Sequence, residues 1–220
     1  MSKQLNIAGV VLAAGKGERF GTPKQFESVG GQRLVDRAIA LLQKKCSPVI
    51  LVLPSDVAWS GLQVDACVEG GNSRVQSLEK GLVALSENTD IVVVHDCARP
   101  LADESLIERL VRQVQDGADA AVPGWTSADV IKRVKPDGSL EHVGREEFVI
   151  VQGPVACRLS VLRQALKSAG ENLVEESEAI ERIGGRVVAV QGNSWSHHVV
   201  DEQDLQNISR ILPRTKIIPE

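Results

Sequence analysis

The chain has 220 residues, of which 43% are hydrophobic and 25% are charged, as is usual for a globular protein with its own core. A net charge of −4 argues against a general nucleic-acid binder. No apolar run approaches the ~20 residues of a membrane helix, and the first residues lack the features of a secretory signal. We therefore expect a cytoplasmic protein with neither a nucleic-acid nor a membrane partner. The four cysteines are widely spaced without a Cys-x-x-Cys pair, which predicts reduced, mostly buried thiols.

Apolar strands and amphipathic helices alternate along the first half of the chain. The hydrophobic patterns predict strands at 7–12, 48–53, 63–68, 91–94 and 119–123, and helices at 33–45, 70–85 and 103–115. Further helices are expected at 158–168, 175–183 and 201–212, with a strand at 186–190. This order is typical of an α/β fold, a mostly parallel Rossmann-like sheet with helices on both faces, and we interpret residues 1–220 as a single domain.

The segment at about 130–150 departs from this alternation. Val130–Lys135 and Leu140–Val143 alternate in polarity around a Pro-Asp-Gly turn, which predicts a β-hairpin. A hairpin that interrupts an α/β domain often projects as an arm and needs a partner to bury its apolar face. We interpret it as a dimerisation arm of a homodimer; a hairpin folded back on its own domain is the alternative.

The loop after the first strand carries the strongest chemical signal. Ala13, Ala14, Gly15 and Gly17 allow a close approach of the backbone to a ligand, and successive N–H groups can hold phosphate oxygens. Positive charge comes from three residues in the same stretch: Lys16, Arg19 and Lys24. The glycine spacing fits neither a Walker loop nor the dinucleotide-binding Gly-x-Gly-x-x-Gly motif. The loop therefore predicts an anion site of another kind.

Several motifs in order give the chain a recognisable pattern. The loop reads Leu-Ala-Ala-Gly-x-Gly-x-Arg-Phe and is followed by Pro-Lys-Gln-Phe. Gly-Gly-Asn-Ser-Arg-Val-Gln-Ser follows at 70–77, Val-His-Asp-Cys-Ala-Arg-Pro at 94–100, Asp-Val-Ile-Lys at 129–132 and Val-Gly-Arg at 143–145. Together these motifs resemble those of the 2-C-methyl-D-erythritol 4-phosphate cytidylyltransferases, within the sugar nucleotidyltransferases. The resemblance spans nearly the whole chain.

The resemblance implies a reaction that joins CTP to a polyol phosphate and releases pyrophosphate, with Mg²⁺ as cofactor. It implies that Arg19 and Lys24 act on the triphosphate and that Asp96 binds the metal. It further implies that Arg145 acts from the arm across the dimer. Nucleotide binding would fall to residues of the first loop and of the Gly-Gly-Asn turn: Ala13, Ala14, Gly15, Lys16, Gly17, Gly70, Gly71, Asn72 and Ser77. Acceptor binding would fall to four residues: Asp96, Arg99, Val130 and Arg145.

The acceptor half departs from the family pattern. Val130 stands in place of a threonine, and His198 stands in place of the lysine beside the metal and the α-phosphate. Histidine is shorter and only partly charged near neutral pH. We count His198 among the catalytic residues, and we expect Arg74 to hold the Gly-Gly-Asn turn. The departures leave two alternatives open: a ribitol 5-phosphate or other polyol-phosphate cytidylyltransferase, and a catalytically weakened paralogue that binds nucleotide.

Overall fold

The computed structural model describes residues 5–17, 19–170 and 173–212. Its main sheet is formed by β1 (Ile7–Leu12), β4 (Val49–Leu53), β5 (Ala66–Glu69), β6 (Ile91–Asp96), β7 (Ala120–Trp125), β10 (Ile150–Val151), β11 (Val155–Arg158) and β12 (Val187–Gln191). The strands β5, β4, β1 and β6 lie side by side and parallel, and β12 is parallel to β7. The prediction of a mostly parallel sheet is therefore confirmed.

An antiparallel insertion joins the two parallel parts of the sheet. β11 lies between β6 and β7 and runs antiparallel to both, and β10 pairs with the far end of β7. No strand was expected at 150–158. The four residues of β11 lead directly into a helix that begins at Leu159. So short a run cannot show the hydrophobic periodicity that would distinguish a strand from the start of that helix.

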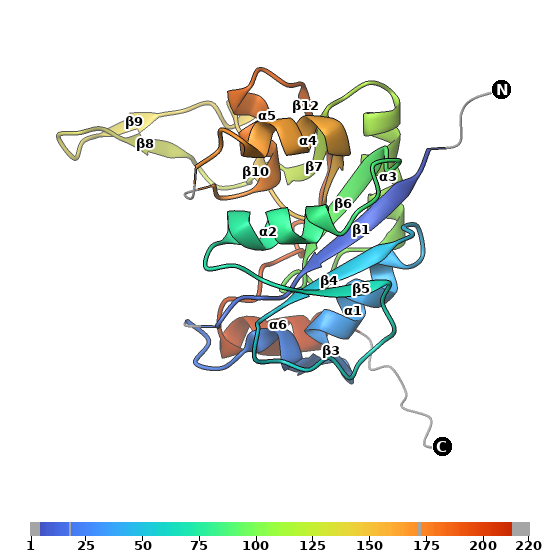
Figure 1. The fold of residues 1–220 in the computed structure, drawn as a ribbon. Coiled ribbons are helices and arrows are strands. Elements are labelled where there is room, and N and C mark those ends of the chain that lie inside the picture. Colours follow the sequence, from blue (N-terminus) through green and yellow to red (C-terminus); the bar gives the residue numbers. More distant parts are fainter. Residues whose placement is uncertain (1–4, 18, 171–172, 213–220) are drawn as a thin grey trace.

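Helices cover both faces of the sheet, as predicted (Figure 1). α2 (Arg74–Val83), α4 (Leu159–Leu166) and α5 (Glu176–Arg182) pack on one face, and α1 (Leu34–Leu42) and α3 (Glu104–Gln115) pack on the other. The side chains of β1 alternate between the two cores, with Ala8, Val10 and Leu12 in one and Val11 in the other. A strand buried on both faces reads as a continuous apolar run, which is why its bounds were predicted correctly.

α6 (Glu202–Ile211) closes a third, smaller core with Val29 and Leu34. It begins at a capping box, in which Asp201 accepts a hydrogen bond from the backbone of Asp204 and Asp204 accepts one in return. A short turn of 3-10 helix, η1 (Lys24–Phe26), leads into the two-stranded sheet of β2 (Ser28–Val29) and β3 (Gln32–Arg33) beside it. These small elements fix the path of the chain after the first loop.

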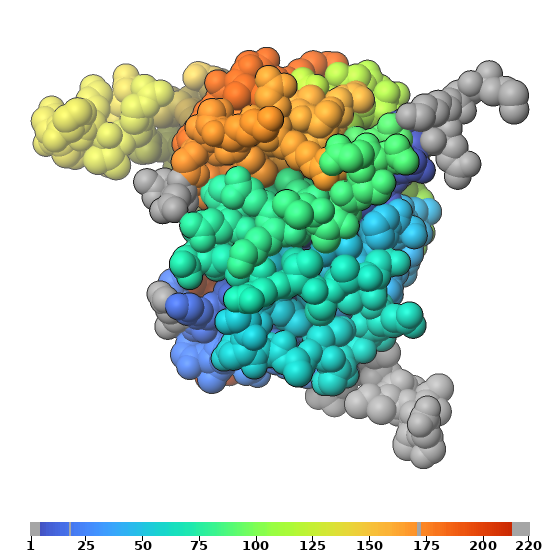
Figure 2. Space-filling model, viewed as in Figure 1, coloured from blue at the N-terminus to red at the C-terminus, as the bar shows by residue number. Residues whose placement is uncertain are grey.

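The hairpin consists of β8 (Lys132–Val134) and β9 (Leu140–His142), followed by a 3-10 turn, η2 (Arg145–Glu147). It projects away from the body of the molecule, as the yellow extension in Figure 2 shows. Val130, Val134 and Leu140 are 63–71% exposed, and the last two are cross-strand partners. These three apolar side chains of the arm are therefore left to solvent in a single chain.

Two further expectations can be compared with the structure. All four cysteines are free thiols; Cys46, Cys97 and Cys157 are buried and Cys67 is exposed, which confirms that prediction. Among the described residues, no helix is both long and apolar enough to cross a membrane.

Candidate active site

A cavity of about 570 Å³ opens at the carboxyl ends of β1 and β6. Ligands of open α/β sheets bind at this edge because the loops that leave the parallel strands converge there. The predicted site residues that line it come from four separate stretches of the chain: Ala13, Ala14, Gly15, Lys16, Gly17, Arg19, Lys24, Gly71, Asn72, Ser77, Asp96 and His198. The structure thus brings together most of the residues that the motifs singled out.

The first loop turns sharply at Gly17. Its φ of +68° lies in the left-handed region, and a Cβ there would meet the Thr22 carbonyl oxygen at 1.8 Å, so only glycine fits. The Gly17 carbonyl accepts hydrogen bonds from the N–H groups of Phe20 and Gly21. This turn leaves Lys16 and Arg19 exposed at the mouth of the cavity.

Lys24 lies deeper, on η1. Its Nζ donates a hydrogen bond to the Val199 carbonyl oxygen at 2.7 Å, which holds the ammonium between the first loop and the segment before α6. Burial lowers the pKa of Lys24, and the Arg19 charge lowers it further, while Asp96 partly offsets both. An incoming polyphosphate would displace water from around this ammonium. The attraction between the ammonium and the phosphate charges would then be stronger than in bulk water.

The turn after β5 forms the opposite wall. The Ser77 hydroxyl accepts a hydrogen bond from the Gly71 N–H at 3.0 Å, and Lys80 Nζ donates to the Gly70 carbonyl oxygen at 2.8 Å. Gly70 does not itself line the cavity; it packs against the first loop, where a Cβ on Gly70 would meet Ala14 Cβ at 2.3 Å. The two glycine-containing segments therefore pack directly against each other, and together they form a slot on this side of the cavity.

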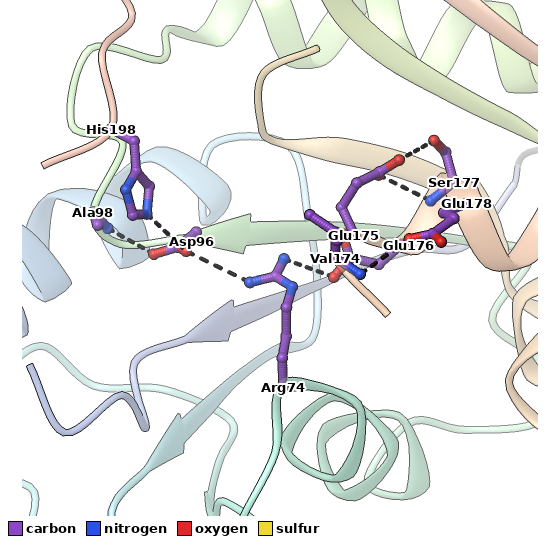
Figure 3. Close-up of polar contacts among 9 residues, drawn as sticks. All are labelled: Arg74, Asp96, Ala98, Val174, Glu175, Glu176, Ser177, Glu178 and His198. Carbon is purple, nitrogen blue, oxygen red and sulfur yellow. Dashed lines mark hydrogen bonds and ion pairs between the residues drawn. The ribbon is translucent and has the colours of Figure 1, made fainter. Parts of the chain in front are cut away.

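Asp96 ends β6 and lies at the centre of a polar network (Figure 3). Its Oδ1 accepts a hydrogen bond from the Ala98 N–H at 2.9 Å, and its Oδ2 faces His198 Nε2 at 3.3 Å and Arg74 Nη1 at 3.5 Å. Burial acts to raise the pKa of Asp96, but the hydrogen bond from His198 and the charge of Arg74 outweigh it and hold the pKa well below its usual range. The carboxylate is ionised and a quarter exposed.

This arrangement fits a magnesium ion that arrives with a nucleotide. Among the described residues, no group of three or more histidine, cysteine or acidic side chains could hold a metal by itself. Mg²⁺ is commonly bound by one or two carboxylates together with substrate phosphates and water. Asp96 would supply one oxygen ligand at the edge of a cavity whose other charged side chains are basic.

Three predicted acceptor residues lie outside this cavity in a single chain. Arg99 donates from Nη1 to the Ser196 carbonyl oxygen at 3.2 Å, and burial lowers its pKa. Arg145 is exposed on η2 and donates to the Ala128 carbonyl oxygen, and Val130 is 71% exposed. Their roles in acceptor binding remain predictions, and that of Arg145 depends on the dimer.

The role expected for Arg74 is wrong in one respect. Its guanidinium does not hold the Gly-Gly-Asn turn; the backbone of that turn is bonded by Ser77 and Gln76. Arg74 instead pairs with Asp96 and with Glu176, 102 residues further along. The helix dipole disfavours a positive charge in the first turn of a helix. The position of Arg74 was therefore a local indication that an acidic partner from elsewhere in the chain compensates its charge.

His197 and His198 are neighbours in the sequence but differ in their surroundings. They lie in an irregular segment before α6, where His197 is exposed and His198 turns toward Asp96 (Figure 3). His198 therefore lies where the resemblance placed it, beside the carboxylate proposed to bind the metal.

The chain is similar to known proteins over nearly its full length. The family model described as 2-C-methyl-D-erythritol 4-phosphate cytidylyltransferase (IspD) matches residues 7–214. The enzyme of that name from Streptomyces avermitilis is 32% identical over 232 residues, covering 96% of this chain and 93% of the relative. A bifunctional enzyme IspD/IspF from Hyphomonas neptunium is 34% identical over 213 residues, which cover 94% of this chain but only 56% of the relative.

A solved structure gives the same result. The crystal structure of 2-C-methyl-D-erythritol 4-phosphate cytidylyltransferase from Thermus thermophilus superposes with a TM-score of 0.79 at 27% identity, covering 94% of this chain and 98% of that one. Fold and sequence agree over nearly the full length, and the chain belongs to the 2-C-methyl-D-erythritol 4-phosphate cytidylyltransferase family.

Proposed function

We propose that this protein transfers the cytidylyl group of CTP to 2-C-methyl-D-erythritol 4-phosphate and releases pyrophosphate. An oxygen of the acceptor's phosphate attacks the α-phosphorus of CTP, a new P–O bond forms, and the bond to the bridging oxygen breaks. The electron pair of that bond leaves with pyrophosphate. Because the attacking oxygen is already anionic, the step needs no protein base, and the protein's task is to hold two anions together.

The observation that carries the proposal is the convergence of Arg19, Lys24 and Asp96 on one cavity. The two cations can neutralise the triphosphate and the charge that develops at the α-phosphorus. Magnesium bound at Asp96 would supply further neutralisation of phosphate charge. His198, whose Nε2 lies beside Asp96, stands where the family has a lysine and would contribute to the same part of the site.

The slot between the first loop and the Gly-Gly-Asn turn is the proposed nucleotide site. Backbone groups of Ala13, Ala14 and Gly15 and the turn at Gly71 border it, with Ser77 holding the turn. A narrow slot suits a pyrimidine better than a purine, and backbone donors and acceptors can read the edge of a cytosine.

We further propose a homodimer formed through the arm. The exposed cross-strand pair of Val134 and Leu140 needs an apolar partner, and the symmetric partner available to every chain is a second copy. In that assembly Arg145, which lies just after the arm, would serve the cavity of the partner subunit and bind the acceptor's phosphate.

Pyrophosphate release tests the function. Purified protein, CTP and Mg²⁺ are offered 2-C-methyl-D-erythritol 4-phosphate, ribitol 5-phosphate and other polyol phosphates in separate reactions. We expect turnover with the first. Turnover with ribitol 5-phosphate alone would assign another acceptor, and CTP binding without turnover would indicate a weakened paralogue.

A further inference from the structure

Arg74 lies between two carboxylates that belong to distant parts of the chain (Figure 3). Its Nη2 donates to Glu176 Oε1 at 2.8 Å, whereas its Nη1 lies 3.5 Å from Asp96 Oδ2. The guanidinium is thus held closely by the carboxylate at the start of α5 and only loosely by the carboxylate in the cavity.

Glu176 has no access to the cavity. It is 1% exposed and does not line the site, and its Oε2 has no hydrogen-bond partner among the described residues. Burial raises the pKa of Glu176, and the Arg74 charge limits that rise. A buried carboxylate persists only where a cation or several donors compensate it, and Arg74 is the cation that does so here.

The charges around Arg74 determine how much negative charge a cation would meet at Asp96. Glu176, Arg74 and Asp96 together carry a net charge of about −1, because one guanidinium is shared by two carboxylates. If Glu176 were neutral, the fork of Arg74 could close on Asp96 in the bidentate geometry that arginine and carboxylate prefer. That contact would tighten the ion pair of Arg74 with Asp96 and cancel the negative charge that a metal would otherwise meet.

We propose that Glu176 is a positioning residue that keeps Arg74 from closing on Asp96 and so preserves the negative charge with which Asp96 would receive the magnesium of the nucleotide. This inference rests on the proposed function, since it assumes that the metal binds at Asp96. It assigns a role to a buried side chain that touches neither nucleotide nor metal.

The test is the effect of magnesium on CTP binding, measured by calorimetry without an acceptor. For each variant, the dissociation constant of CTP in EDTA is divided by that in saturating Mg²⁺. Glu176→Gln keeps the shape of the side chain and removes its charge. We expect this ratio to fall about threefold or more, while the affinity for metal-free CTP stays equal or rises, because the site has become more positive.

Two variants separate this mechanism from simple damage. Glu178→Gln makes the same chemical change on the same helix, where Glu178 pairs with Arg182, and should leave the ratio unchanged. Arg74→Gln should change the ratio in the opposite direction, because it frees Asp96, and it should weaken metal-free CTP. This second prediction holds the proposal open to test even if Glu176→Gln does not fold.

The outcomes are distinguishable from those of the functional assay. Wild-type turnover decides the proposed function, and the ratios decide this inference. An unchanged ratio in Glu176→Gln, an equal fall in Glu178→Gln, or a fall in Arg74→Gln would each overturn it. A wild-type ratio near one would also overturn it, because Asp96 would then not receive the metal.

Discussion

The proposed chemistry makes its most specific prediction for the charge of Lys24. Lys24→Met keeps the length of the side chain and removes the ammonium that lies 2.7 Å from the Val199 carbonyl oxygen. Removing one preorganised charge from a transition state typically costs about 3 kcal/mol, which corresponds to a loss on the order of 100-fold in kcat.

Stability should change much less than activity in this variant. The lost hydrogen bond to Val199 costs about 1 kcal/mol, but the variant no longer buries a charge, and these terms oppose one another. We therefore expect a melting temperature close to that of the wild type, so that the loss of rate cannot be ascribed to unfolding.

The assay is the initial rate of pyrophosphate release at saturating CTP and acceptor. Lys16→Met is the matched control, because Lys16 lines the same cavity but is exposed, where water and salt screen its charge. We expect Lys16→Met to lose less than about tenfold. Equal losses in both variants, or a loss below about tenfold in Lys24→Met, would refute the argument from burial.

The remaining predictions concern pH, the histidine, the nucleotide slot and the arm. Burial lowers the pKa of Lys24 from 10.5, and the ammonium is the active form, so kcat/KM should fall as pH rises through that lowered pKa. Lys24→Arg should move this fall to higher pH. An unmoved pH profile would contradict the assignment of the fall to Lys24. His198→Lys should preserve or raise the rate of pyrophosphate release, and a drop of more than about tenfold would show that His198 does not replace a lysine. Gly70→Ala, whose Cβ would meet Ala14, should raise the KM for CTP several-fold with a smaller effect on kcat, and an unchanged KM would place the nucleotide elsewhere. Leu140→Asp should convert a dimer to a monomer in analytical ultracentrifugation, and a wild-type monomer at assay concentration would contradict the arm's proposed role.

Local patterns were enough to predict most elements of the fold. The strand at Ile7–Leu12 follows from an apolar run that both cores require, and the start of α6 follows from two aspartates three residues apart. The hairpin follows from alternation around a turn in which Gly138 has a φ of +81°. Each of these features depends on a hydrogen-bonding or burial pattern of residues that are close together in the sequence.

The candidate site was predictable only in part. Motifs identified the loop, Lys24 and Asp96, and the edge of a parallel sheet explains why they meet. Sequence reasoning overlooked Glu176, because nothing local shows that this acidic residue is 1% exposed.

The sequence by itself determined the alternation of strands and helices, the glycine at the sharp turn and the chemical types available to the site. Only the tertiary structure decided that β11 runs antiparallel between β6 and β7 and that Arg74 contacts Asp96 and Glu176, 22 and 102 residues away. Such pairings depend on the free energy of packing distant segments together, which the spacing of residues along the chain does not encode.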